Sequence, residues 1–185
     1  MPRPRRIEGY AVVSREGMIC TADRVMPDSL KIEADQRFYH SAVDRADAVA
    51  NGRHSNEGGP HAAERPRLQL TRRIPALAAH PTNANTVLWN PAGATFEEAW
   101  ERLAVDGVLA VVGGTDVFGL FLTIGYDLFF LSRAQSRVPD GRPVFPDVPQ
   151  KTPEAILSAH GMVRKDARVL DDRAGVTLEQ WVKSH

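Results

Sequence analysis

The chain has 185 residues, 43% of them hydrophobic and 25% charged, which suffices for one substantial core and predicts a single domain over residues 1–185. Basic and acidic residues number 23 each, so no net charge favours nucleic acid or an anionic membrane surface as a partner. The apolar runs are shorter than the roughly 20 residues that span a bilayer, and residues 1–6 lead into polar Glu8 rather than a secretory segment. We therefore expect a cytoplasmic protein with no membrane contact.

Short apolar runs alternate with helical patterns along the chain, and turn residues separate them. At the start of one helix, Thr95 and Glu98 form a capping box. In chain order the sequence predicts a strand over 7–14, a long mobile loop, a helix over 33–45, strands over 48–51, 68–71 and 86–89, a helix over 96–103, a strand over 108–112, a helix after 114 and a strand over 127–132. Residues 162–170 and 177–182 form either late antiparallel strands or a terminal helix.

This order predicts an α/β fold with three layers, in which helices cover both faces of a mostly parallel central sheet. Ligands of such sheets bind at the carboxyl ends of the strands. Three predicted strands end in glycine or polar residues, at 52–55, 70–73 and 113–115. In a parallel sheet these segments share one edge, so we expect them to build one site.

The Gly113-Gly114 pair is the most informative of these strand ends. An apolar strand stops at two residues without side chains and a helical pattern begins at Thr115. Such a junction lets a ligand approach the backbone and presents helical N–H groups to an anion. It is typical of sites for a phosphorylated cofactor, although a glycine pair also forms ordinary turns.

Cysteine and histidine spacing argues against metal chemistry. The single cysteine, Cys20, excludes an intrachain disulfide and any zinc site that needs two cysteines, and is expected to be a small buried hydrophobe. The six histidines form no HExxH motif and no paired metal spacing. The sequence therefore predicts no metal site.

Taken in order and spacing, these motifs resemble the dihydrofolate reductase superfamily, including the reductase domain at the C-terminal end of the bifunctional riboflavin-biosynthesis enzyme. No single motif is specific; their order carries the resemblance, which covers roughly residues 7–149. The matching segments are 11–14, 17–19, 46–49, 52–55, 70–72, 113–122 and 141–147.

The resemblance implies a reductase that uses NADPH. Arg53 and Arg72, each just past a strand, could bracket an adenosine 2′-phosphate, because guanidinium groups grip phosphate oxygens in a bidentate manner. Asp116 stands where dihydrofolate reductases often have a basic residue, and the apolar positions among the contacts could equally be core. The implied cofactor contacts are Val12, Val13, Ile19, Gly52, Arg53, His54, Ser55, Thr71, Arg72, Gly113, Gly114, Thr115, Asp116 and Val117.

The resemblance also implies an acid at the start of the first helix, which binds the substrate ring and relays a proton to it. Glu33 and Asp35 are the candidates, although acids in a first helical turn are also common dipole partners. Asp35 fits better, since residues 34–37 resemble the riboflavin-pathway pattern. The implied substrate contacts are Asp28, Phe38 and Ser132.

Asp28 and Asn56 replace two tryptophans that are usual in dihydrofolate reductases. The hypothesis is therefore an NADPH-dependent reductase of a small pyrimidine- or pterin-type heterocycle, similar to the 5-amino-6-ribosylaminouracil phosphate reductase of riboflavin biosynthesis. Dihydrofolate reduction and a catalytically silent nucleotide-binding protein are the alternatives. The expected partner is a small-molecule substrate, and riboflavin-pathway relatives suggest a homodimer.

Overall fold

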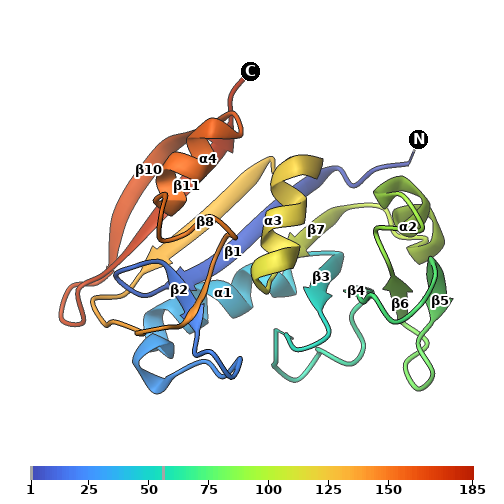
Figure 1. Cartoon of the computed structure of the whole chain (residues 1–185), viewed down its shortest axis with the longest axis horizontal. Coiled ribbons are helices and arrows are strands. Elements are labelled where there is room, and N and C mark those ends of the chain that lie inside the picture. The colour runs from blue at the N-terminus through green and yellow to red at the C-terminus, as the bar shows by residue number, and fades with distance from the viewer. Residues whose placement is uncertain (1, 56) are drawn as a thin grey trace.

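The fold is described from a computed structural model that covers residues 2–55 and 57–185. Its centre is a nine-stranded sheet with the order β10-β11-β8-β1-β7-β3-β4-β6-β5 (Figure 1). The strands are β1 (Arg6–Val13), β2 (Met18–Cys20), β3 (Ala48–Gly52), β4 (Arg67–Leu70), β5 (Leu77–Ala79), β6 (Thr86–Trp89), β7 (Val108–Val111), β8 (Leu128–Arg133), β9 (Arg142–Pro143), β10 (Met162–Asp171) and β11 (Val176–Lys183). The helices are α1 (Glu33–Asp44), α2 (Phe96–Leu103), α3 (Thr115–Ile124), α4 (Pro153–Ala159) and the 3-10 helix η1 (Asp28–Leu30).

The central strands β8, β1, β7, β3, β4 and β6 are parallel to their neighbours, and β5, β11 and β10 add antiparallel pairings at the two sides. The predicted mostly parallel sheet is therefore confirmed. Its parallel strands direct their carboxyl ends to one edge, as expected for a site assembled from strand ends. Strands β2 and β9 form a separate antiparallel pair.

Helices cover both faces of the sheet, because its strand residues alternate between two apolar clusters. Val49 and Ala110 pack with Ala42 and Val43 of α1 on one face. Their chain neighbours Ala48, Ala50, Leu109 and Val111 belong to the larger cluster with α2, α3 and α4 on the other. This period of two is that of a sheet buried on both sides. The predicted three-layer arrangement is confirmed (Figure 1).

Local sequence signals explain where helices begin. The predicted capping box of α2 is present: Glu98 N donates to Thr95 Oγ1 at 3.2 Å, and Thr95 N donates to Glu98 Oε2 at 2.7 Å. The helix ends at Ala104, whose backbone is left-handed. Helix α3 begins at Thr115, directly after the glycine pair, as predicted.

The C-terminal segment is the antiparallel hairpin β10–β11, which settles the alternative left open by its sequence. Sequence analysis missed α4, η1 and the short strands β2, β5 and β9, of which β2 and η1 lie in the stretch predicted as a long loop. Helix α4 carries its own start signal, since Thr152 accepts a hydrogen bond from Ala155 N at 3.1 Å and Pro153 occupies the first turn. Strand β5 spans only three residues and pairs with β6 alone, so its sequence offers little pattern to detect.

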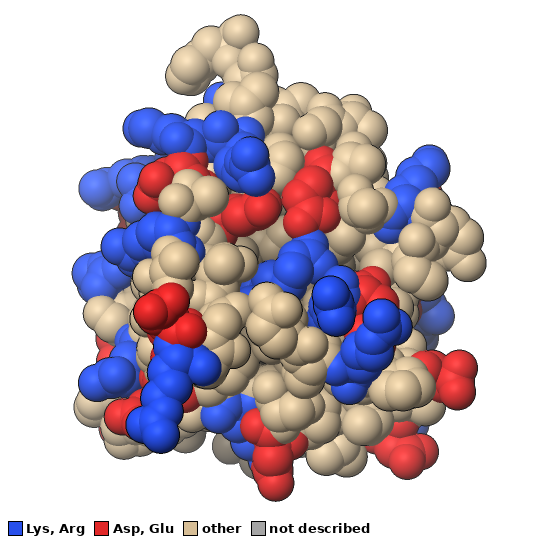
Figure 2. Space-filling model, turned by 90° about the vertical axis from the view of Figure 1, so that its left-hand side faces the viewer, with Lys and Arg blue, Asp and Glu red and all other residues tan. Residues whose placement is uncertain are grey.

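Charges are mixed over the surface. On the side of the molecule that lies to the left in Figure 1, basic and acidic side chains alternate with uncharged surface, as Figure 2 shows. This matches the equal numbers of basic and acidic residues in the sequence. Within the described residues, no helix is long and apolar enough to cross a bilayer.

Candidate functional site

A cavity of about 1270 Å³ opens at the carboxyl ends of the parallel strands. It brings together the three predicted strand ends, 52–55, 70–73 and 113–115, of which only Gly113 does not line it. The first and third of these segments touch directly, since Gly52 N donates to Gly113 O at 2.8 Å. The expectation that separate motifs build one site is therefore met.

One end of the cavity is shaped for an anion. The N-terminus of α3 has no side-chain cap, so its first N–H groups remain open toward the cavity. A Cβ atom on Gly114 would lie 3.5 Å from Ser55 Oγ and 4.0 Å from Ile19 Cδ1. Glycine at this position thus leaves open the space between a hydroxyl and an apolar side chain, so that a ligand can approach the backbone there.

Basic side chains border the same end. The Arg53 guanidinium hydrogen-bonds the His54 imidazole, with Nη2 and Nε2 2.9 Å apart. Desolvation and the charges of Arg53, Arg24, Arg73 and Arg142 lower the pKa of His54, in that order of size. Arg72 also lines the cavity, where it is largely exposed and pairs with Asp116 at 3.4 Å.

The other end of the cavity holds a buried acid. Asp35 lies in the first turn of α1 and is only 6% exposed. Burial raises its pKa, and a hydrogen bond from the Ser132 hydroxyl and the proximity of His40 partly oppose this rise. Ser132 is held on β8 opposite Val12 of β1. A carboxyl group in this setting can keep a proton at higher pH than an exposed one.

Aromatic rings line the same cavity as Asp35. The Phe38 and Phe130 rings meet edge to face with centroids 5.4 Å apart, and Tyr10 stacks on Phe130 at 5.1 Å. All three line the cavity. They give this part of the cavity apolar walls in addition to the buried carboxyl of Asp35, a surface suited to a flat heterocyclic ring.

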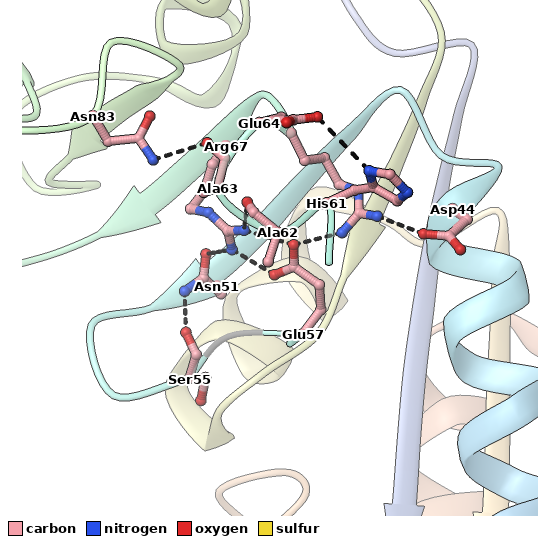
Figure 3. Close-up of polar contacts among 11 residues, drawn as sticks. Asp44, Asn51, Ser55, Glu57, His61, Ala62, Ala63, Glu64, Arg67 and Asn83 are labelled. Atoms are coloured by element: carbon pink, nitrogen blue, oxygen red, sulfur yellow. Dashed lines mark hydrogen bonds and ion pairs between the residues drawn. The ribbon is translucent and has the colours of Figure 1, made fainter. Parts of the chain in front are cut away.

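A buried charge network fixes the turn at the anion end. The Glu57 side chain is fully buried and pairs with Arg65 Nη1 and Arg67 Nη2, each at 2.6 Å. Arg67 Nη1 also donates to Asn51 Oδ1 at 2.9 Å, and the Asn51 amide donates to the backbone oxygens of Gly52 and Ser55. Figure 3 shows Asn51 between the Arg67 guanidinium and Ser55. The network thus connects the 52–55 turn to β4 through Asn51 and Arg67 and holds the turn in place.

Known proteins resemble this chain in structure over nearly its whole length, but not detectably in sequence. No protein-family model matches the sequence, and no curated protein is detectably similar to it. A protein from Shewanella sp. PV-4, provisionally assigned to riboflavin biosynthesis, is similar with a TM-score of 0.66 and 12% identity over 97% of this chain and 99% of that one. Dihydrofolate reductase from Enterococcus faecalis, in complex with NADP(H) and RAB-propyl, is similar with a TM-score of 0.63 and 14% identity over 97% of each chain.

The chain has the dihydrofolate reductase fold. The resemblance found in the sequence is thereby confirmed at the level of the fold. Identities of 12% and 14% carry no further than that, so the chemistry of the site has to be argued from its own residues.

Within the dihydrofolate reductase fold, most predicted site residues line the cavity. Asp116 does so while paired with Arg72. The others that line it are Val12, Ile19, Asp35, Phe38, Gly52, Arg53, His54, Ser55, Thr71, Arg72, Gly114, Thr115, Val117 and Ser132. Among the described residues, no group of three or more His, Cys, Asp or Glu side chains could hold a metal ion.

Four predicted residues do not line the cavity. Glu33 is exposed on the outer side of α1, near Arg37 at 3.9 Å, because it lies two positions from Asp35 and a helix turns that far to another face. The Asp28 side chain is 96% exposed and pairs with Lys31. Val13 is fully buried in the core, since alternate residues of β1 face opposite sides of the sheet. Gly113 contributes a backbone bond to Gly52 instead.

Two further expectations have different outcomes. Cys20 was expected to be buried, yet it is half-buried and lines the cavity, where burial raises the pKa of its thiol. Its strand β2 belongs to the small two-stranded sheet rather than to the central one, and so is not covered by helices. The expectation for Asn56 lies outside the described residues.

Proposed function

We propose that the protein is an NADPH-dependent reductase of a small heterocyclic substrate of the pyrimidine or pterin type. One observation carries this proposal: a single cavity joins an anion-binding end, at Gly114 and Ser55, to a buried acid with apolar walls, at Asp35. A dinucleotide that extends through this cavity would place its phosphates at the first end and its nicotinamide near the second.

The residues at the anion end fit such a cofactor. The open N-terminus of α3 and Ser55 would hold the diphosphate, and Arg53 with Arg72 would bind the 2′-phosphate. Ile19 and Val12 would contact the nicotinamide by shape. A bound dihydronicotinamide supplies the hydride, so the chain needs no nucleophile of its own.

Asp35 would supply the proton that accompanies the hydride. Its raised pKa keeps more of it protonated near neutral pH than an exposed aspartate, and Ser132 orients the carboxyl. Phe38 and Phe130 would exclude water from the ring that is reduced. The reaction requires only alignment of cofactor and substrate and one proton donor.

The position of Asp35 in the first turn of α1 also favours a second candidate, dihydrofolate reduction. Oxidation of NADPH by dihydrofolate, and methotrexate binding, would support this candidate over a riboflavin-pathway substrate. A protein that binds NADPH but turns over neither a pterin nor a ribosylaminopyrimidine would be a silent nucleotide-binding protein.

The test of the cofactor is a titration of the purified protein with NADPH and with NADH, followed by quenching of its tryptophan fluorescence. We expect NADPH to bind more tightly than NADH. Arg53→Ala and Arg72→Ala should each lower the affinity for NADPH by about tenfold and leave the affinity for NADH nearly unchanged. Arg102→Ala, on the exposed surface of α2 away from the cavity, is the matched control. Failure of both nucleotides to bind would contradict the reductase proposal.

A further inference from the structure

Two arginines outside the predicted nucleotide motifs reach the cavity from another wall. Arg24 follows β2 and Arg142 lies in β9, and both line the cavity. Strand β9 pairs with β2, so that Arg142 stands opposite Cys20. The Thr115 hydroxyl donates to Pro143 O at 2.5 Å. This bond fixes β9 to the first turn of α3 and holds Arg142 beside the open helix N-terminus.

The charges of these two arginines act on the same space as those of the strand-end arginines. After desolvation, the groups that lower the pKa of His54 are Arg53 on its own turn and Arg24, Arg73 and Arg142 from other segments. Arg142 and Arg24 also act on the Cys20 thiol, where they oppose the pKa rise that burial causes. Arg24 and Arg142 therefore lie near both His54 and Cys20 and line the same cavity as Arg53, although they come from other segments of the chain.

Over residues 2–55 and 57–185, none of Arg24, Arg53, Arg73 and Arg142 forms an ion pair, whereas the nearby Arg72 pairs with Asp116. Of the carboxylates that line the cavity, Asp116 pairs with Arg72, Asp147 with Lys151 and Glu57 with Arg65 and Arg67. Like charges that converge in a partly enclosed space repel one another unless an anion lies between them.

We propose that Arg24 and Arg142 bind a phosphate of the ligand from the β2–β9 segment, so that the anion is held between this segment and the N-terminus of α3. This proposal rests on the proposed function for the identity of the ligand, and its chemistry is that of a phosphate group. The diphosphate shared by NADPH and NADH is the source we favour, because Arg142 is fixed beside the helix N-terminus that would hold it. A phosphate ester on the substrate is the other source.

The experiment uses Arg24→Gln and Arg142→Gln, with Arg102→Gln on α2 as the control. Each variant is titrated with NADPH and with NADH by tryptophan fluorescence. We expect Arg24→Gln and Arg142→Gln each to lower the affinities for NADPH and NADH by the same factor, about tenfold or more. Each variant loses a charge-assisted hydrogen bond to the diphosphate, which both nucleotides share. This differs from the loss of NADPH alone expected for Arg53→Ala and Arg72→Ala.

A second titration, with inorganic phosphate by calorimetry, separates the sources. Variants that bind both nucleotides normally but lose phosphate binding in the presence of saturating NADPH would assign the site to a substrate phosphate. Unchanged binding of nucleotides and of phosphate in both variants would overturn the proposal. If the wild-type protein binds neither nucleotide, the proposed function fails, and phosphate titration of the same variants still decides whether these arginines bind an anion.

Discussion

Two buried carboxyl groups lie in contrasting surroundings. Glu57, in the loop after β3, pairs with two arginines. Burial alone would raise its pKa, but hydrogen bonds from Arg67 and Arg65 outweigh burial, and the net pKa is lowered. Asp35, in α1, has a hydroxyl neighbour, Ser132, and among the described residues it forms no ion pair, so burial dominates and raises its pKa.

The contrast separates a structural acid from a chemical one. Glu57 stays ionised and ties the 52–55 turn to the sheet through Arg67 and Asn51. Both acids line the cavity, but only Asp35 has a raised pKa and can therefore hold a proton at higher pH than an exposed aspartate. Perturbed carboxyl groups in a cavity are candidates for proton transfer, whereas those with full sets of partners serve the fold.

The largest effect expected is on stability, from Glu57→Gln. The substitution leaves Arg67 buried without a counter-charge and Arg65 with Asp44 alone, and loss of one member of a buried ion pair typically costs about 3–5 kcal/mol. Urea unfolding would measure the loss. Glu64→Gln is the control, because its side chain is 81% exposed in the same loop. Equal stability of the two variants would mean that the network does not support the turn.

The second effect is on turnover, from Asp35→Asn. We expect the rate to fall by about a hundredfold or more, since a positioned proton donor contributes on that scale, while NADPH affinity is retained. Measurement requires an active substrate, found by monitoring NADPH oxidation. Glu33→Gln, two residues earlier on the exposed side of α1, should leave the rate unchanged. A slow Glu33→Gln and a normal Asp35→Asn would reverse the assignment.

Asp35→Asn also tests the direction in which the pKa of Asp35 is shifted. Because the folded-state pKa of Asp35 is raised, its contribution to stability is fully present below its ordinary pKa and is lost as pH rises through the raised value. Asparagine does not titrate, so the Asp35→Asn variant does not lose this stability as pH rises. Between acidic and neutral pH, the thermal unfolding midpoint of the variant should therefore fall less than that of the wild type. A buried acid that supported the fold would give the opposite result.

A smaller change is expected from Ser132→Ala. The Ser132 hydroxyl stabilises the ionised carboxylate, so its removal should raise the pKa of Asp35 further and extend activity toward higher pH. A pH profile of kcat would detect the shift. Thr86→Ala is a suitable control, because Thr86 is also a buried hydroxyl residue on a strand but lies outside the cavity. A profile that moved to lower pH would contradict the role of the Ser132 hydroxyl in stabilising the ionised Asp35.

The sequence predicts the scaffold of this site better than its details. Periodicity and caps locate the strands that end at Gly52, Leu70 and Val111, and parallel pairing then brings those ends together. The sequence favours Asp35 over Glu33 only through the family resemblance, whereas the turn of the helix decides between them by burying Asp35 alone. Helical spacing relative to Ala42 and Val43 could have provided that signal.

Other features depend on contacts between distant segments. Glu57, Arg65 and Arg67 form no recognisable motif, since their pairing depends on the course of the loop between β3 and β4. Arg142 reaches the anion end only because β9 pairs with β2, more than a hundred residues earlier. Local patterns cannot specify such pairings, and charged residues in loops are usually solvated.

The smallest expected effect is on NADPH affinity, from a substitution of Asp116, whose carboxylate is exposed whereas those of Glu57 and Asp35 are buried. Its pair with Arg72 spans 3.4 Å with both side chains mostly exposed, so it contributes little to stability. If Arg72 binds the 2′-phosphate, Asp116 competes with that phosphate for the guanidinium and also repels it. Asp116→Asn should therefore tighten NADPH by about two- to fivefold at low salt, with less effect on NADH, and the gain should shrink as salt rises. Equal gains for both nucleotides would place Asp116 nearer the diphosphate, and weaker NADPH binding would mean that the Arg72–Asp116 pair positions the arginine rather than competing for it.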